Sequence, residues 1–235
     1  MKRLSINGAE ALANKMRVYA GISLTEPVNI KTLLRKMGIQ AMYRPMSEES
    51  YGICIKTDIA KFILVNSNTT RGRQHFTIAH ELFHLFFDEN PRPHICGVST
   101  DPVEKDANLF ASALLMPREG LYASISDDEL RHHKLSISTV LKLEQLYGVS
   151  RKAMLCRLKD IGALSEATFK ALDSVGARES AIAYGYDTSL YEKGNEGVVI
   201  GDFGEKARIL FDQGKISEGH YMELLNMWSD DRPES

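Results

Sequence analysis

Residues 76–88 read FTIAHELFHLFFD, and this run decides how the rest of the chain is interpreted. Its apolar residues fit a buried helix, but His80, Glu81 and His84 interrupt one side of it. Asn and Thr residues just before the run offer N-caps, and the prolines of DENPRP (88–93) predict that the helix ends there. The sequence therefore predicts a mostly apolar helix that carries two histidines and a glutamate.

The spacing of these polar residues, HExxH, points to a metal ion. Four helical residues rotate the chain by about 400° and advance it by about 6 Å, so His80 and His84 lie one above the other. Neutral imidazoles placed in this way reach a single ion, and Zn²⁺ accepts nitrogen ligands at about 2.0–2.1 Å. In such a motif the glutamate accepts a proton from water without being a ligand. We therefore predict one zinc ion per chain, bound by His80 and His84, with Glu81 as general base.

The surroundings of the motif favour this interpretation. Arg73 and Thr77 share the polar face of the two histidines and are candidates to support the ligands. The alternative is a pair of core or surface histidines without a metal ion. It is disfavoured because unpaired imidazoles buried in such a helix are costly, and apolar residues cover much of the remaining surface: Phe76, Ala79, Leu82, Phe83 and Phe86.

A catalytic zinc site usually has a third protein ligand, and a second helix offers Glu104. This helix is predicted to begin at Asp101 or Pro102 and to end at Met116, before Pro117. The interval after the first helix allows a loop and a returning helix. Small alanines on the side of Glu104 allow the two helices to pack closely.

Two aspartates of the second helix are rival ligands. Asp106 points about 200° away from Glu104 around the helix axis, and Asp101 is expected to be the N-cap. Asn108 follows Glu104 by one turn and shares its face. It is therefore the best candidate in this helix to orient a ligand by a hydrogen bond.

The remaining pattern predicts more helix than strand, with strands that cluster instead of alternating with helices. That arrangement favours an α+β fold. Helical periodicity marks residues 8–20 and 28–39, and Gly148 is the turn of a helix-turn-helix-like unit over 137–164. A polar tail, SDDRPES, is expected to be disordered. β-branched and aromatic residues predict short strands at 40–45, 52–56, 61–66 and 197–201.

Composition is that of a soluble globular protein. The 235 residues allow one large or two small domains, and 43% hydrophobic and 26% charged residues are ordinary values. A net charge of −2 gives no electrostatic case for nucleic acid as the main ligand. Three cysteines without a CxxC pair fit reduced thiols, and neither a signal peptide nor a membrane span is visible. A cytoplasmic protein without membrane contact is expected.

The two metal-binding segments read RQHFTIAHELFH (73–84) and EKDANLFASALLMP (104–117). Both resemble the ImmA/IrrE family of bacterial and phage metallopeptidases, in which an Arg-Gln-x-Phe-Thr-hydrophobic-Ala-His-Glu-x-x-His segment precedes a Glu-x-x-Ala-Asn-x-Phe-Ala-x-x-Leu-Leu-Met-Pro segment. The resemblance is dense between these limits and looser from residue 28 to about 164. Phe83 departs from the family pattern, because glycine often precedes the second histidine there, but no ligand is lost.

The resemblance implies that His80, His84 and Glu104 bind zinc and that Glu81 is the general base. It also implies a zincin-like, predominantly helical core with a small β-sheet. We expect this core over residues 1–130, a helix-turn-helix-like unit packed on it, and a helical C-terminal region with a disordered tail. The last two regions are expected over 131–164 and 165–235.

The implied activity is that of a zinc-dependent endopeptidase of restricted specificity. Its implied substrate is a DNA-binding helix-turn-helix repressor whose cleavage switches on phage, mobile-element or stress-response genes. Some relatives are toxins paired with a helix-turn-helix antitoxin. Two alternatives from other classes remain: a catalytically silent protein that binds its repressor, and a DNA-binding regulator with a structural metal ion.

A peptidase must also stabilise a developing oxyanion. The nearest downstream candidates for this role are Tyr122, Arg131, His132 and His133.

The other histidines and a cysteine near the motif are expected to have no part in catalysis. His75 is expected at the surface. His94 and Cys96 are expected in a plain loop, with a regulatory fourth metal ligand as the less favoured alternative.

The helix-turn-helix-like unit has two interpretations. One is DNA contact, and the other is a structural helical pair packed against the core. The slightly acidic chain favours the second, so direct DNA binding is not expected. Residues 165–235 either pack on the rest or present a groove to a partner, and the sequence does not decide between these. The basic residues available for DNA contact are Arg151, Lys152, Arg157 and Lys159.

Overall fold

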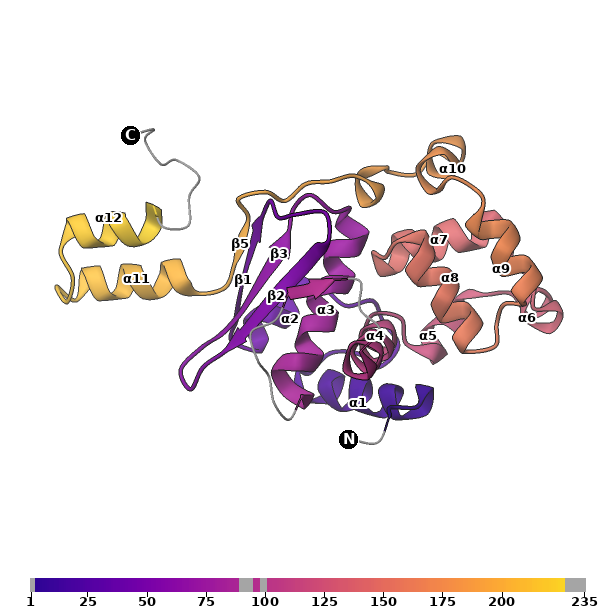
Figure 1. The fold of residues 1–235 in the computed structure, drawn as a ribbon, viewed down its shortest axis with the longest axis horizontal. Helices are drawn as coiled ribbons and strands as arrows, with labels where there is room; N and C mark the ends of the chain where they lie inside the picture. The colour runs from indigo at the N-terminus through magenta and orange to yellow at the C-terminus, as the bar shows by residue number, and fades with distance from the viewer. Residues whose placement is uncertain (1–2, 89–94, 98–100, 227–235) are drawn as a thin grey trace.

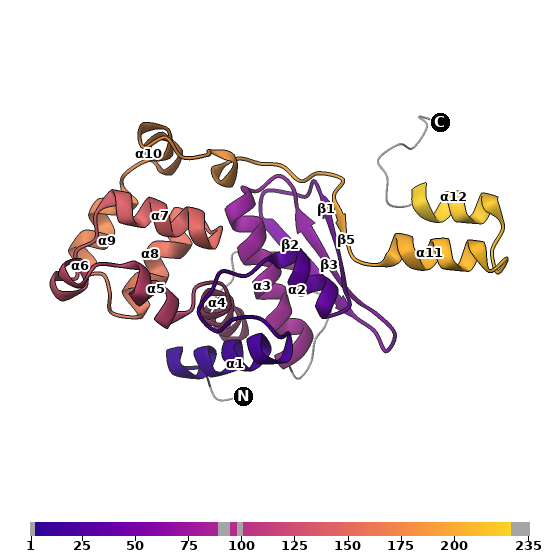
Figure 2. The same ribbon diagram turned by 180° about the vertical axis from the view of Figure 1, so that it is seen from behind.

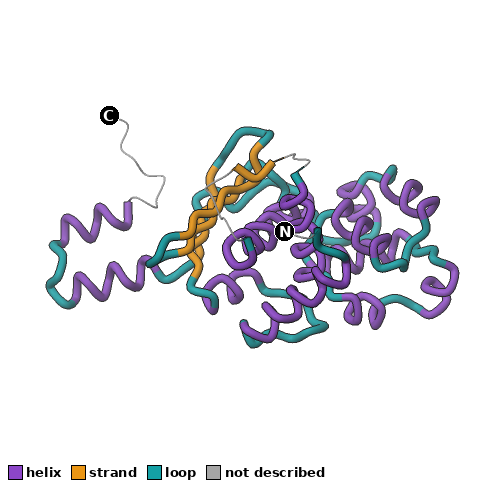
Figure 3. The backbone as a smooth tube through the Cα atoms, turned by 60° about the horizontal axis from the view of Figure 1, so that its bottom comes forward, coloured by secondary structure: helices purple, strands orange, loops and turns teal. Residues whose placement is uncertain are grey.

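The computed structural model describes residues 3–88, 95–97 and 101–226 (Figure 1). Helices outnumber strands, and the strands form one mixed sheet, which confirms the predicted α+β class. The sheet lies between the helices of the core and a C-terminal helical hairpin (Figures 2 and 3). The tail SDDRPES and His94 lie outside the described residues.

The sheet has the strand order β4-β2-β3-β1-β5. β1 runs parallel to β3, whereas β2 pairs antiparallel with β3 and β5 antiparallel with β1. Alternate residues of β1 are buried, as expected for a sheet with one face against a core. Four strands lie close to their predicted positions: β1 (Ile39–Arg44), β2 (Ser50–Lys56), β3 (Lys61–Asn66) and β5 (Val199–Ile200).

The fifth strand was not predicted. β4 (Ile95–Gly97) pairs antiparallel with β2, and Cys96 lies opposite Gly52. The expectation that Cys96 lies in a plain loop is therefore wrong. Three residues are too few to show the period-two pattern by which a strand is recognised in a sequence.

Most helices begin at a capping side chain that the sequence supplies. Ser136 and Ser150 cap α7 and α8, and Gly148 ends α7 in the left-handed conformation. None of the helices in the described parts of the chain has the length and apolarity that a membrane crossing needs. The helices are α1 (Ile6–Tyr19), α2 (Ile30–Lys36), α3 (Arg71–Phe87), α4 (Pro102–Leu115), α5 (Arg118–Ser124), α6 (Asp127–His132), α7 (Ile137–Tyr147), α8 (Arg151–Asp160), α9 (Glu166–Asp173), α10 (Ala177–Ala183), the short 3-10 helix η1 (Ser189–Tyr191), α11 (Phe203–Asp212) and α12 (Glu218–Asn226).

Helix α3 is buried between the sheet and α4 (Figure 1). Its contact with β2 depends on Gly52, because a Cβ atom there would lie 2.6 Å from Thr77 Cγ2 and 3.1 Å from Glu81 Oε1. Ala107 and Ala111 of α4 are fully buried, as their predicted role in close helix packing requires. The fold thus holds the HExxH helix against a strand on one side and against α4 on the other.

A C-terminal strap, residues 189–195, crosses the beginning of α3. Arg71 N donates to Glu192 O at 3.0 Å, and Gln74 Nε2 donates to Gly194 O at 2.9 Å. Asn195 Nδ2 in turn donates to Gln74 Oε1 at 2.7 Å. The strap therefore fixes the first turn of the helix that carries the motif.

Candidate metal centre

Three side chains from α3 and α4 meet in a nearly equilateral triangle, with the two carboxylate oxygens of Glu104 together at one corner. His80 Nε2 lies 3.1 Å from Glu104 Oε2 and 3.2 Å from His84 Nε2, and His84 Nε2 lies 3.3 Å from Glu104 Oε1. Tetrahedral ligands at about 2.0–2.1 Å from an ion are separated from one another by about 3.3–3.4 Å. The described side chains therefore fit one small divalent metal ion without rearrangement.

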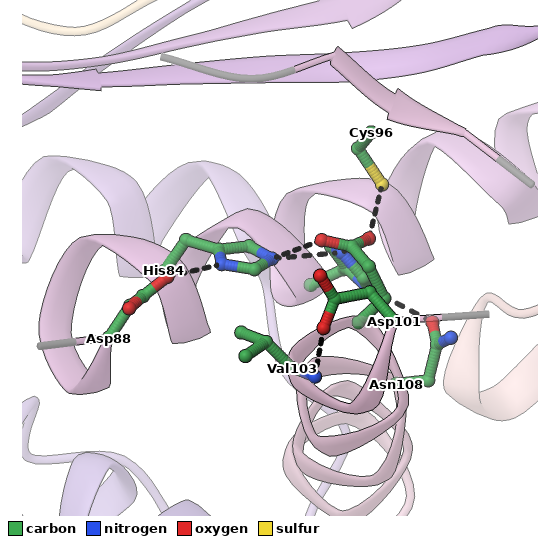
Figure 4. Close-up of polar contacts among 8 residues, drawn as sticks. His84, Asp88, Cys96, Asp101, Val103 and Asn108 are labelled. Carbon is green, nitrogen blue, oxygen red and sulfur yellow. Dashed lines mark hydrogen bonds and ion pairs between the residues drawn. The ribbon is translucent and has the colours of Figure 1, made fainter. Parts of the chain in front are cut away.

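The Nδ1 atom of each imidazole, which is not part of the triangle, contacts an oxygen acceptor. His80 Nδ1 lies 3.0 Å from Asn108 Oδ1, and His84 Nδ1 lies 3.2 Å from Asp88 Oδ2 (Figure 4). Amide and carboxylate oxygens only accept hydrogen bonds, so both Nδ1 atoms carry the proton. In that tautomer each Nε2 would offer its lone pair to a metal ion.

Glu81 lies beside this triangle with no exposed surface. Neither of its carboxylate oxygens has a hydrogen-bond partner among the described residues. A buried polar group without a partner is rare and often marks a functional site. Its position under Gly52 keeps the carboxylate in place, and its oxygens remain available to accept a proton.

The two rival acids of α4 are engaged elsewhere. Asp101 accepts a hydrogen bond from Val103 N at 2.9 Å as the helix N-cap, as predicted. Asp106 accepts one from Leu4 N at 3.0 Å and so fastens the N-terminal segment to α4. Of the three acids considered, it is Glu104 that the structure places between the two histidines.

The other supporting candidates differ in position. Asn108 contacts His80 directly, as described above. Thr77 is buried against Gly52, and Arg73 lies with its guanidinium 4.3 Å from the centre of the Tyr51 ring. Thr77 therefore shapes the contact with β2, and Arg73 lies at the rim of the site.

A cavity of about 440 Å³ opens next to Asn108, between α3, α4 and α8. Its lining includes Phe76 and Leu109, and Asp160 is its one carboxylate among the described residues. Because basic residues outnumber this carboxylate, the cavity favours a ligand that carries an anionic or polar group next to an apolar group. The basic lining residues are Arg3, Arg73, Lys105 and Lys152.

The structure does not bring the predicted oxyanion residues to this centre. Tyr122 donates its hydroxyl hydrogen to Ile161 O at 2.6 Å, and His133 Nδ1 contacts Gly162 O at 2.7 Å. Arg131 and His132 are exposed on α6, which lies at the outer end of the helical unit, away from α3 (Figures 1 and 2). Helix α6 is tied to α7 through Glu129, which accepts hydrogen bonds from Ser136 N and Thr139 Oγ1, each at 2.8 Å.

Of the residues at the centre, Asp88 was missed from the sequence, and Cys96 was considered only as a less favoured fourth ligand. Asp88 follows His84 by one helical turn, a spacing from which its contact could have been predicted. Cys96 reaches the centre only through the unpredicted strand, and its Sγ lies 3.8 Å from Glu104 Oε2 (Figure 4). Burial, together with the negative charges of Glu81 and Glu104, raises the pKa of the Cys96 thiol.

Substituting Asn108, whose side chain contacts His80, is expected to weaken metal binding. Asn108→Ala removes the acceptor that holds the imidazole, and such losses typically lower metal affinity by about 10–100-fold. Competition with a chromogenic chelator measures this. Lys105→Ala, an exposed change on the same helix and the same cavity, is the control and should bind as the wild type does. Equal affinities in the two variants would contradict the orienting role.

His75, expected at the surface, is half-buried, with Nδ1 at 2.9 Å from Gly148 O. Burial lowers its pKa, with a smaller contribution from the charge of Lys31, and outweighs the opposing effect of the Gly148 carbonyl. The unfolded chain therefore binds more protons, and stability must fall as the pH drops through about 6.5. Urea unfolding should show that the free energy of unfolding falls less for His75→Gln than for the wild type between about pH 7.5 and 5.5. An identical loss would contradict this assignment.

Comparison with known proteins identifies the family of this chain. A family model described as Peptidase_M78, the IrrE N-terminal-like domain, matches residues 34–159. This span is more than half of the chain and includes α3 and α4 with every residue of the triangle. No curated protein matches the chain in a sequence comparison. The family match, over the segments that build the candidate metal centre, shows that the chain belongs to the Peptidase_M78 family, described as the IrrE N-terminal-like domain.

Proposed function

We propose that this protein is a zinc-dependent endopeptidase of restricted specificity that cleaves a helix-turn-helix repressor or antitoxin. The observation that carries the proposal is the triangle of His80, His84 and Glu104 atoms with edges of 3.1–3.3 Å, next to the unpartnered carboxylate of Glu81. Two nitrogens and one carboxylate with an adjacent acid are the donor set of catalytic zinc sites, which leave a fourth position open.

The reaction follows from these positions. Zinc bound there supplies Lewis acidity, which polarises the scissile carbonyl and lowers the pKa of the attacking water. Glu81 accepts the proton of that water and passes it to the leaving amine nitrogen. Asn108 and Asp88 hold the two imidazoles in the productive tautomer during this transfer.

The cavity beside Asn108 supports restricted specificity. None of His80, Glu81, His84 and Glu104 lines it, but Asn108 does and also contacts His80, so a substrate side chain some way from the scissile bond would enter it. Its basic and apolar lining favours an acidic or amide side chain over a basic one. A substrate lacking such a residue would be held less well.

The choice of a repressor or antitoxin rests on the family resemblance. The α7–α8 unit, by contrast, gives little support to direct DNA binding. Arg151 and Arg157 are buried and held by Glu144 and Glu10. The remaining two basic side chains form ion pairs with α9: Lys152 with Asp173 at 2.6 Å and Lys159 with Glu166 at 3.0 Å. The unit therefore acts as a packed helical pair, and the proposed partner is a protein.

Chelation and restoration test the proposal. The purified protein is incubated with a candidate helix-turn-helix protein chosen from the neighbouring genes, and products are identified by mass spectrometry. One or a few cuts are expected, lost after chelation and restored by one equivalent of Zn²⁺. Cleavage that persists in a preparation with no stoichiometric metal would overturn the mechanism, and an intact partner in the presence of zinc would overturn the assigned substrate.

A further inference from the structure

We infer that Cys96 is a fourth protein ligand of the metal ion held by His80, His84 and Glu104. The inference rests on the metal site of the proposed function and goes beyond it. A peptidase of this kind needs three protein ligands and an open position. A thiolate in addition would give the ion a closed set of four.

The topology brings Cys96 to this place. Strand β4 pairs with β2, and Cys96 lies opposite Gly52, whose backbone runs directly over Glu81. The side chain is buried and projects from the sheet onto the carboxylate of Glu104 (Figure 4). Cys96 therefore faces the ion position from the sheet, whereas the other three ligands come from the helices.

The distances match a shared ion. Cys96 Sγ lies 3.8 Å from Glu104 Oε2, and one donor atom each of His80, Cys96 and Glu104 lie within 4.8 Å of one another. For a tetrahedral ion with bonds of about 2.3 Å to sulfur and about 2.0 Å to oxygen or nitrogen, neighbouring ligands are about 3.5 Å apart. The distance between Cys96 Sγ and Glu104 Oε2 is a few tenths of an ångström above this value.

The buried carboxylates near Cys96 also favour a cation at this place. Glu81 is fully buried, and its carboxylate oxygens have no hydrogen-bond partner among the described residues. With Glu104 it forms a pair of buried acids around the thiol. Buried charges of one sign are normally compensated by an opposite charge or a metal ion. A divalent cation between Cys96 and Glu104 provides that compensation.

The consequence is a resting form with a closed site. Four protein ligands are typical of structural zinc, whereas catalysis needs one of them to leave. Cys96 is the ligand best placed to leave, because it is held by a three-residue strand at the sheet edge and not by a helix.

Cobalt substitution tests the inference on the full chain. Co²⁺ is titrated into the metal-free protein, and its visible d–d bands report binding while a near-ultraviolet charge-transfer band reports a thiolate ligand. We expect both signals in the wild type and in Cys54→Ser, a buried cysteine on the neighbouring strand. Cys96→Ser should keep the visible bands, which also shows that it is folded, and lose the near-ultraviolet band.

Each other outcome is decisive. Visible bands without the charge-transfer band in the wild type would mean that Cys96 only donates a hydrogen bond to Glu104, and the inference would fail while the proposed metal site stands. A charge-transfer band that survives in Cys96→Ser would also overturn it. If the wild type binds no cobalt, both the inference and the proposed zinc peptidase fail.

Discussion

Glu81→Gln is expected to lower kcat for cleavage by about 10²–10⁴-fold, the usual contribution of a general base. The amide has nearly the same shape as the carboxylate but cannot take the proton of the attacking water. Glu81 does not belong to the triangle of proposed metal ligands, so the metal content should remain at one ion per chain. The loss should appear in the rate and not in the affinity for the partner.

Cleavage rates and bound metal are measured on the same preparations. Glu119→Gln, an exposed change of the same kind on α5, is the control and should cleave at the wild-type rate. In cells, a Glu81→Gln variant that still relieves repression would show that the protein acts by binding its partner, and the peptidase proposal would be abandoned.

Glu144→Ala is expected to lower the free energy of unfolding by about 3–5 kcal/mol, the typical cost of breaking a buried ion pair. Glu144 has no exposed surface, and the guanidinium of Arg151 is bound to it. Tyr191 also donates its hydroxyl hydrogen to Glu144 at 2.7 Å. The substitution therefore leaves a buried positive charge without its carboxylate.

Lys152→Ala provides the matched comparison in the same helix. Its pair with Asp173 is largely exposed, so its loss should lower the free energy of unfolding far less than Glu144→Ala does. Urea unfolding of the metal-saturated proteins measures both values. Equal losses would show that the burial of the Glu144–Arg151 pair has no energetic consequence.

The helices of the metal centre were predictable because their information is local. Helical spacing alone places His80 and His84 together and Asn108 on the face of Glu104. Proline and aspartate mark the beginning of α4 within a residue. The choice of Glu104 over Asp106 also followed from helical geometry, before the contact of Asp106 with Leu4 was known.

The contributions of distant segments could not be predicted in the same way. Cys96 enters the site through the pairing of β4 with β2, a contact between segments far apart in the sequence. The oxyanion candidates were selected by closeness along the chain, yet α6 packs with the helical unit and faces away from α3. The direction in which a helix packs depends on partners that its own periodicity does not identify.

Strand β5 has a further consequence, for the solubility of the chain. Ala41 of β1 lies opposite Ile200, and Tyr43 exchanges hydrogen bonds with Val198 and Gly197. These contacts cover backbone groups that would otherwise form an open sheet edge, and open edges pair with other chains. A protein truncated within the strap would keep α3 and α4 but lose β5. Its β1 edge would then be exposed, and we expect it to aggregate.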